Sequence, residues 1–103
     1  MTNYLGNAFS LQMINLEESR NLRVDKVDPE EIPNEVVSCI GHADTAKVVS
    51  EILGREIAMN RISVHLDDGD VLYVAQITGG RLPEGTTSLP EGFSITFLKV
   101  NVE

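Results

Sequence analysis

One stretch of this chain shows the spacing of an amphipathic α-helix clearly, and that helix limits how the rest can fold. Val48, Val49, Ile52 and Leu53 recur at helical intervals, and Gly54 supplies a stop. The pattern predicts a helix over about residues 44–53. Several other apolar segments are short or alternate with polar residues, which is typical of strands.

The expected strands lie on both sides of this helix in the sequence. They are residues 3–9, 22–27, 62–66, 71–78 and 93–102. A short helical segment is expected over residues 11–16, and another is expected to open at Pro33. The Asp-Asp-Gly-Asp run at 67–70 predicts a hairpin turn between two of the strands. The sum is a single α/β (α+β) domain over residues 1–103, with helices packed on a mixed sheet of about five strands.

Residues 79–92 are the one long irregular stretch. They hold four glycines and two prolines, and they separate the last two expected strands. Loops of this length in a compact domain are often functional lids or disordered segments, and composition leaves both readings open.

Composition narrows the function classes. The 103 residues carry a net charge of −8, which argues against binding long DNA or RNA because such binding needs a broad basic face. A metal site is not expected, because no Cys/His cluster is present. The single cysteine, Cys39, fits a reducing compartment. We find no membrane-spanning run and no signal peptide, so a cytoplasmic protein is expected.

His42 stands at the start of the predicted helix. Helix N-termini offer free backbone N–H groups and the positive end of the helix dipole, an arrangement that commonly holds phosphate. A phosphate bound there would lie beside a titratable imidazole. A lone histidine at a helix start is nevertheless more often a cap or a surface residue.

Five blocks of residues resemble the viral anti-CRISPR ring nucleases. The blocks are Asn7-Ala8-Phe9-Ser10, Ile40-Gly41-His42 with Thr45, Asn60-Arg61, Tyr73-Val74-Ala75-Gln76-Ile77 and Arg81-Leu82-Pro83-Glu84-Gly85. They occur in matching order from Tyr4 to the end of the chain. The first two blocks together are specific, whereas either alone is weak.

The resemblance implies a homodimer that binds cyclic tetra-adenylate, the second messenger of type III CRISPR systems, in a cleft across the dimer interface. It implies ring cleavage without a metal or other cofactor, which would silence the signal. The catalytic positions match His42, Arg81 and Glu84, with the last two on a loop that closes over the ligand. The substrate-binding positions match Asn7, Ser10, Arg61 and Gln76.

The expected chemistry is attack of a ribose 2′-hydroxyl on the adjacent phosphorus, with His42 as general acid to the departing 5′-oxygen. Simpler readings compete with these roles. Ser10 is also a candidate helix N-cap, and Arg61 a solvated charge. Two other functions stay open: a non-catalytic protein that sequesters or senses a cyclic nucleotide, and a small acidic interaction module with no nucleotide ligand.

Overall fold

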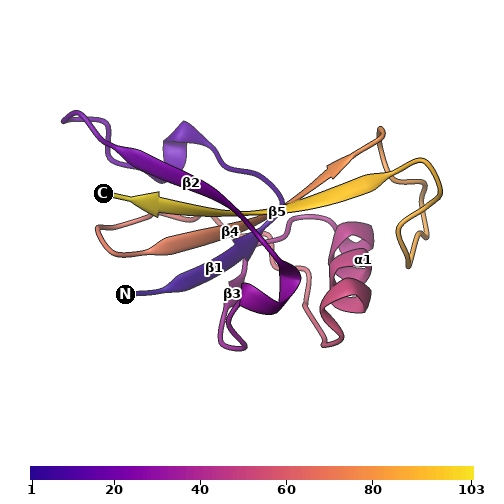
Figure 1. Ribbon diagram of the computed structural model, residues 1–103. Helices are drawn as coiled ribbons and strands as arrows, with labels where there is room; N and C mark the ends of the chain where they lie inside the picture. The colour runs from indigo at the N-terminus through magenta and orange to yellow at the C-terminus, as the bar shows by residue number, and fades with distance from the viewer.

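A five-stranded mixed sheet forms the framework of the protein, which a computed structural model describes over residues 1–103 (Figure 1). The strands are β1 (Asn3–Gly6), β2 (Leu22–Val27), β3 (Val37–Ser38), β4 (Val71–Thr78) and β5 (Ser94–Val102). Their order across the sheet is β2-β5-β4-β1-β3. The pairs β2·β5 and β4·β5 are antiparallel, whereas β1 is parallel to both β3 and β4.

The single α-helix, α1 (Ala43–Leu53), packs on one face of the sheet. His42 is its N-cap, and Gly54 ends it in the left-handed conformation (φ 69°), where glycine has no steric cost. Val48 and Val49 are completely buried. The expected helix over residues 44–53 is therefore confirmed.

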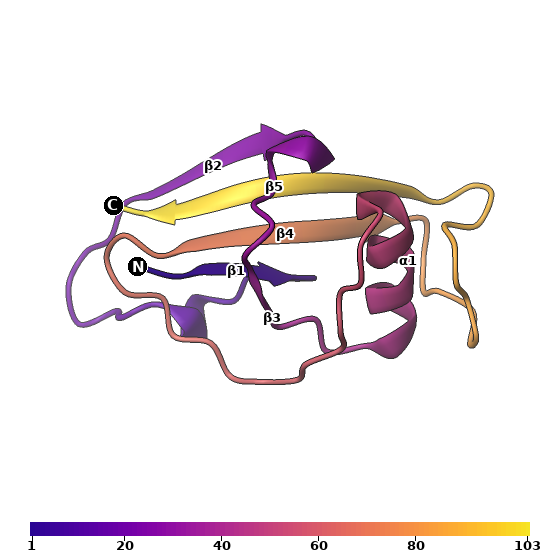
Figure 2. The same cartoon turned by 90° about the horizontal axis from the view of Figure 1, so that it is seen from below.

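Each face of the sheet has its own apolar core. On the α1 face, Leu5, Tyr73, Ala75 and Phe97 pack with the helix and with the segment that crosses from β2 to β3 (Figure 2). The opposite face carries a second cluster, of which Ile14 is a member. Ile14 is the C-cap of the 3₁₀ turn η1 (Leu11–Met13), so the short helical segment expected over residues 11–16 is present but only one turn long.

The expected strand at residues 62–66 is wrong. Val64 and Leu66 are buried as the alternation suggested, but Ile62 is exposed and the segment pairs with no strand. Residues 62–66 would need a free edge of β4 to pair with it as a hairpin. That edge is occupied, because β1 pairs with β4 in parallel there and β5 pairs with its other edge. The 67–70 turn forms, with the Asp70 N–H donating to the Asp67 carbonyl, but it does not join a hairpin.

The helix expected to open at Pro33 is also wrong. A 3₁₀ turn, η2 (Pro29–Glu31), comes earlier, and the chain then becomes extended and adds β3 beside β1. The Arg55 guanidinium donates to the Pro33 carbonyl at 2.7 Å and to Asn34 Oδ1 at 2.6 Å, which holds this segment in its non-helical path.

The first strand is shorter than expected, ending at Gly6 rather than at residue 9. Gly6 marks a close approach, because a Cβ there would lie 2.7 Å from Cys39 Sγ. Glycine within a strand typically marks such a close approach, because it has no side chain to displace. The chain bends after Gly6, which brings Asn7 to the end of the sheet where α1 begins.

The mixed α+β fold and its five strands thus agree with the sequence, although β3 rather than residues 62–66 provides the fifth strand. Residues 79–92 contain no helix or strand and extend beyond the end of the sheet, past α1 (Figures 1 and 2). No helix in the structure is both long and apolar enough to traverse a bilayer.

Candidate functional site

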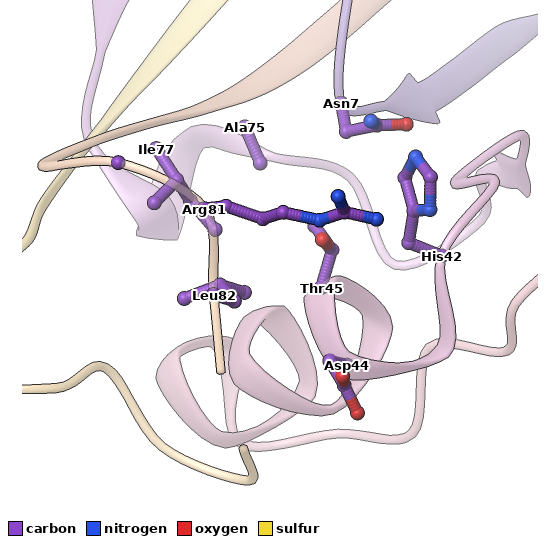
Figure 3. Close-up of a pocket in the computed structure, with 9 residues that line it drawn as sticks. Asn7, His42, Asp44, Thr45, Ala75, Ile77, Arg81 and Leu82 are labelled. Carbon is purple, nitrogen blue, oxygen red and sulfur yellow. The ribbon is translucent and has the colours of Figure 1, made fainter. Parts of the chain in front are cut away.

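A pocket of about 300 Å³ lies where the start of α1 meets the ends of β1 and β4 (Figure 3). Its polar lining comes from Asn7, His42, Asp44, Thr45 and Arg81. Its remaining lining comes from Ala75, Ile77, Gly80 and Leu82. The pocket therefore combines an apolar wall with convergent polar groups, which is the usual composition of a small-molecule site.

His42 is at the N-terminal end of α1, and its side chain is free. Its backbone is extended (φ −132°, ψ 130°), and its carbonyl accepts the N–H of Ala46 at 3.0 Å. The imidazole makes no capping hydrogen bond and is exposed. The simpler reading of His42 as a cap or a surface residue is therefore confirmed by its position and exposure, and the exposed ring is also available to a ligand.

The backbone before His42 is held by neighbouring segments. The N–H of Gly41 donates to Asn7 Oδ1 at 3.3 Å, and the carbonyl of Ile40 accepts the N–H of Asn60 at 2.8 Å. Asn60 Nδ2 also donates to the Ser38 carbonyl at 2.7 Å. A free side chain thus projects from a fixed main chain, which is the arrangement that a binding or catalytic group needs.

Arg81 reaches the same pocket from the loop after β4. Gly79 and Gly80 precede it with φ of 119° and 114°, conformations that L side chains rarely adopt. They let the chain leave β4 and turn toward α1. Figure 3 shows the Arg81 guanidinium directed toward the His42 ring, with Asn7 and Thr45 on either side.

Neither His42 nor Arg81 is used in an ion pair. The ion pairs in the structure are Arg20–Asp68, Arg23–Asp25 and His65–Asp67. The guanidinium therefore keeps its charge and its donors for a ligand. Asp44 also lines the pocket and carries a negative charge, but its carboxylate points away from the Arg81 guanidinium in Figure 3.

Asp44 and Thr45 were not expected in the site, although both lie in the first turn of a helix that the sequence predicted. Thr45 is almost fully buried, and its hydroxyl faces the pocket beside Arg81 (Figure 3). The signal in the sequence was their position directly after His42. Residues in the first turn share the N-terminal end of a helix, so they enter any site built there.

Four predicted site residues lie outside the pocket. Ser10 is the N-cap of η1, accepting the Gln12 N–H at 3.3 Å, so its capping role is confirmed. Glu84 is exposed in the loop beyond Leu82. Gln76 is exposed between Ala75 and Ile77, and because side chains alternate along a strand it faces away from α1.

Arg61 is the fourth. Its guanidinium donates to the Gly41 carbonyl from Nε at 3.2 Å and from Nη2 at 2.8 Å. Arg61 is exposed, as the reading of a solvated charge expected, but its guanidinium also contacts the main chain directly before His42.

Cys39 lies near this region but is poorly suited to act as a nucleophile. Burial raises the pKa of its thiol, and Sγ packs against Gly6. A thiol with a raised pKa is a poor nucleophile because the reactive species is the thiolate. No group of three or more metal-ligating side chains occurs in the structure.

Together, the fold and the pocket define a class: a small mixed α+β domain that presents an imidazole, a guanidinium and a helix N-terminus to one cavity. A family model described as STIV B116-like matches residues 3–94. The chain belongs to that family.

Three proteins to which the chain is similar come from viruses. It is similar to B116 of Sulfolobus turreted icosahedral virus, with a TM-score of 0.79 and 25% identity over 98% of this chain and 99% of that one. It is 49% identical over 49 residues to "Uncharacterized protein 26" of Sulfolobus islandicus filamentous virus (isolate Iceland/Hveragerdi), covering 48% of this chain and 41% of the relative. It is 38% identical over 52 residues to "Uncharacterized protein ORF116" of Acidianus filamentous virus 1 (isolate United States/Yellowstone), covering 50% and 44%.

Two facts follow from these comparisons. The chain matches less than half the length of either of these two curated relatives. The assignment to the viral anti-CRISPR ring nucleases is also corrected: the matching family is STIV B116-like, and the names of the similar viral proteins state no nuclease activity.

Proposed function

We propose that this protein is a metal-independent phosphodiesterase that cleaves cyclic tetra-adenylate. The observation that carries the proposal is the convergence of His42, Arg81 and Asn7, from three separate segments, on one pocket at the start of α1. A proton donor, a fixed positive charge and free helix N–H groups are the parts that a phosphodiester cleavage site requires. The choice of cyclic tetra-adenylate comes from the residue blocks in the sequence.

The chemistry divides among the residues of the pocket. A ribose 2′-oxygen attacks the adjacent phosphorus, the bond from phosphorus to the 5′-oxygen breaks, and the 2′-hydroxyl proton passes to water. His42 donates a proton to the departing 5′-oxygen. The products are a 2′,3′-cyclic phosphate and a 5′-hydroxyl, and the proposed mechanism uses no metal or cofactor. General acid catalysis of this kind contributes about 10²- to 10⁴-fold.

Arg81 has an electrostatic role in this proposal. Its guanidinium stabilises the charge that develops on the phosphoryl oxygens, and it is suited to this because no carboxylate of the protein pairs with it. Glu84 lies three residues further along the same loop, outside the pocket. We propose that the loop closes over the ligand, after which Glu84 orients Arg81.

The active form that we propose is a homodimer. A pocket of about 300 Å³ is at the lower limit of ligand sites, which span roughly 300–1,000 Å³, and it suits one part of a tetranucleotide ring rather than the whole. Two copies related by a twofold axis would present two such pockets to one ring. Two equivalent phosphates would then be cut, giving two linear di-adenylates.

In a cell with a type III CRISPR system, this activity would remove the second messenger and act as an anti-CRISPR. The viral relatives favour a setting in the cytoplasm of an infected host. The proposal includes neither a long nucleic acid nor a membrane as a partner.

Incubation of the protein with cyclic tetra-adenylate in EDTA, followed by separation of the products, tests the activity. We expect linear di-adenylate with 2′,3′-cyclic phosphate ends. The variant His42→Ala should lose at least about 100-fold in turnover, because the general acid is absent, while ligand binding changes little. His65→Ala is the matched control, since the other histidine of the chain is exposed and outside the pocket.

Near-normal turnover by His42→Ala would refute the general-acid role. Binding of the ring without cleavage by the unmodified protein would replace catalysis with sequestration. Sedimentation of the free protein as a strict monomer, with and without the ring, would refute the two-copy site.

A further inference from the structure

Arg61 contacts the main chain directly before His42, yet it does not line the pocket. Its guanidinium donates two hydrogen bonds to one acceptor, the Gly41 carbonyl oxygen. We infer that Arg61 is a positioning residue, which sets the orientation of His42 through the Gly41 carbonyl rather than by touching the ligand. The expected effect on catalysis rests on the proposed function, whereas the orientation of the His42 side chain by Arg61 does not.

The geometry of the peptide bond explains how the contact acts. The Gly41 carbonyl and the His42 N–H belong to one planar peptide unit. Two donors on that oxygen, at 3.2 and 2.8 Å, restrict rotation of the unit, and with it the direction in which the His42 side chain leaves the backbone. Two donors from one rigid guanidinium restrict an acceptor more than a single rotating donor does.

Gly41 is held from its other side as well. Its N–H donates to Asn7 Oδ1, so both peptide units that flank this residue have side-chain partners. The Arg61 side chain also packs over Gly41, since a Cβ built there would lie 3.5 Å from Arg61 Nε and 3.9 Å from Cγ. A glycine is otherwise the most flexible residue of a chain, and here Asn7 and Arg61 remove that freedom.

The His42 side chain has no such support of its own. It makes no capping hydrogen bond, so its placement depends on the backbone from which it projects. Loss of the Arg61 contact should therefore widen the range of imidazole positions without removing any group from the pocket. A displacement of about 1 Å in a catalytic group can cost on the order of 100-fold in rate.

The kinetic test compares Arg61→Met, Arg61→Lys and the control Arg23→Met, which removes an exposed arginine paired only with Asp25. We expect kcat for cyclic tetra-adenylate to fall about 10- to 100-fold in Arg61→Met, with KM changed less than about threefold. Arg61→Lys, which keeps a single donor nitrogen in place of two, should recover part of the loss. A rise in KM with kcat unchanged would overturn the inference and make Arg61 a ligand contact.

A second measurement uses the free protein and needs no activity. NMR of the two imidazoles should show the His42 ring signals shifted or broadened in Arg61→Met, with the His65 signals unchanged as an internal reference. Arg23→Met should leave both rings as they are. If the His42 signals in Arg61→Met match those of the unmodified protein, the positioning role is refuted.

The two measurements fail separately. An unmodified protein that leaves cyclic tetra-adenylate intact overturns the proposed function, and the NMR comparison then decides the positioning role alone. A cleaving enzyme whose Arg61→Met variant keeps full kcat refutes the positioning role and leaves the proposed function standing.

Discussion

Ser50 joins the helix to the segment that supports the site, and its removal gives a measurable prediction. Its hydroxyl accepts the Ile57 N–H at 2.8 Å and donates to the Ala46 carbonyl at 2.7 Å. Ile57 is only 8% exposed, so its N–H has little access to water as a substitute partner. Residues 57–61 then run beside residues 38–41, ending in the Arg61 contact with Gly41.

The size of the effect follows from two terms. A buried N–H that loses its partner costs about 1–3 kcal/mol. Alanine is a better helix former than serine by about 0.5 kcal/mol, which offsets part of that loss. Ser50→Ala should therefore lower the free energy of unfolding by about 1–2 kcal/mol. For a domain of this size each kcal/mol corresponds to about 4–8 °C, so we expect a fall in Tm of roughly 5–15 °C.

Thermal unfolding followed by circular dichroism measures the loss, and amide hydrogen exchange at Ile57 localises it. Lys47→Ala is the matched control, because it is an exposed position on the same helix and should change stability by less than about 0.5 kcal/mol. A Ser50→Ala variant as stable as Lys47→Ala, with unchanged protection at Ile57, would refute the reasoning.

Two further predictions concern stability. The Asp70 carboxylate accepts the N–H groups of Asp67 and Thr2, and chiefly the Asp67 bond lowers the pKa of this carboxyl. A carboxyl whose pKa is lowered by folding stabilises the folded state above its ordinary pKa near 3.9, and this stabilisation is lost as the pH falls below that range. The unmodified protein should therefore have a larger free energy of unfolding than Asp70→Asn at pH 7, and the difference should shrink toward pH 2.5. A gap that stays constant in urea titrations at both pH values contradicts this. Gly6→Ala should lower the free energy of unfolding by about 1–3 kcal/mol, because the added Cβ would contact Cys39 Sγ. In a double-mutant cycle, the variant that also carries Cys39→Ala should recover most of this loss. Additive losses from the two substitutions would exclude the contact as the cause.

Local patterns were sufficient for the long elements. The helix and its stop at Gly54 depend on neighbours three and four residues apart, so the spacing alone located them. The strands β2, β4 and β5 were found within a residue of their bounds, because alternation and β-branched side chains persist over six or more positions.

Part of the site could likewise be anticipated. Asn7, His42 and Arg81 were singled out in the sequence and do meet in one pocket. The others did not join them for reasons that local sequence cannot show. Side chains alternate along β4, so Gln76 faces the side of the sheet opposite to Ala75 and Ile77. The sequence pattern does not show which of the two sides α1 covers, because that depends on tertiary packing.

What the amino-acid sequence by itself determined is the set of elements with short-range signals and the polar groups that a ligand site would use. What only the tertiary structure decided is which edges pair and which segments meet. Residues 62–66 carry a strand pattern but lose the edge of β4 to β1, and β3 forms instead from two residues with little signal of their own. For the same reason, Arg61 donates to the Gly41 carbonyl and does not face the pocket. Contacts between distant segments depend on which segments pack together, and the local sequence around Arg61 does not contain that information.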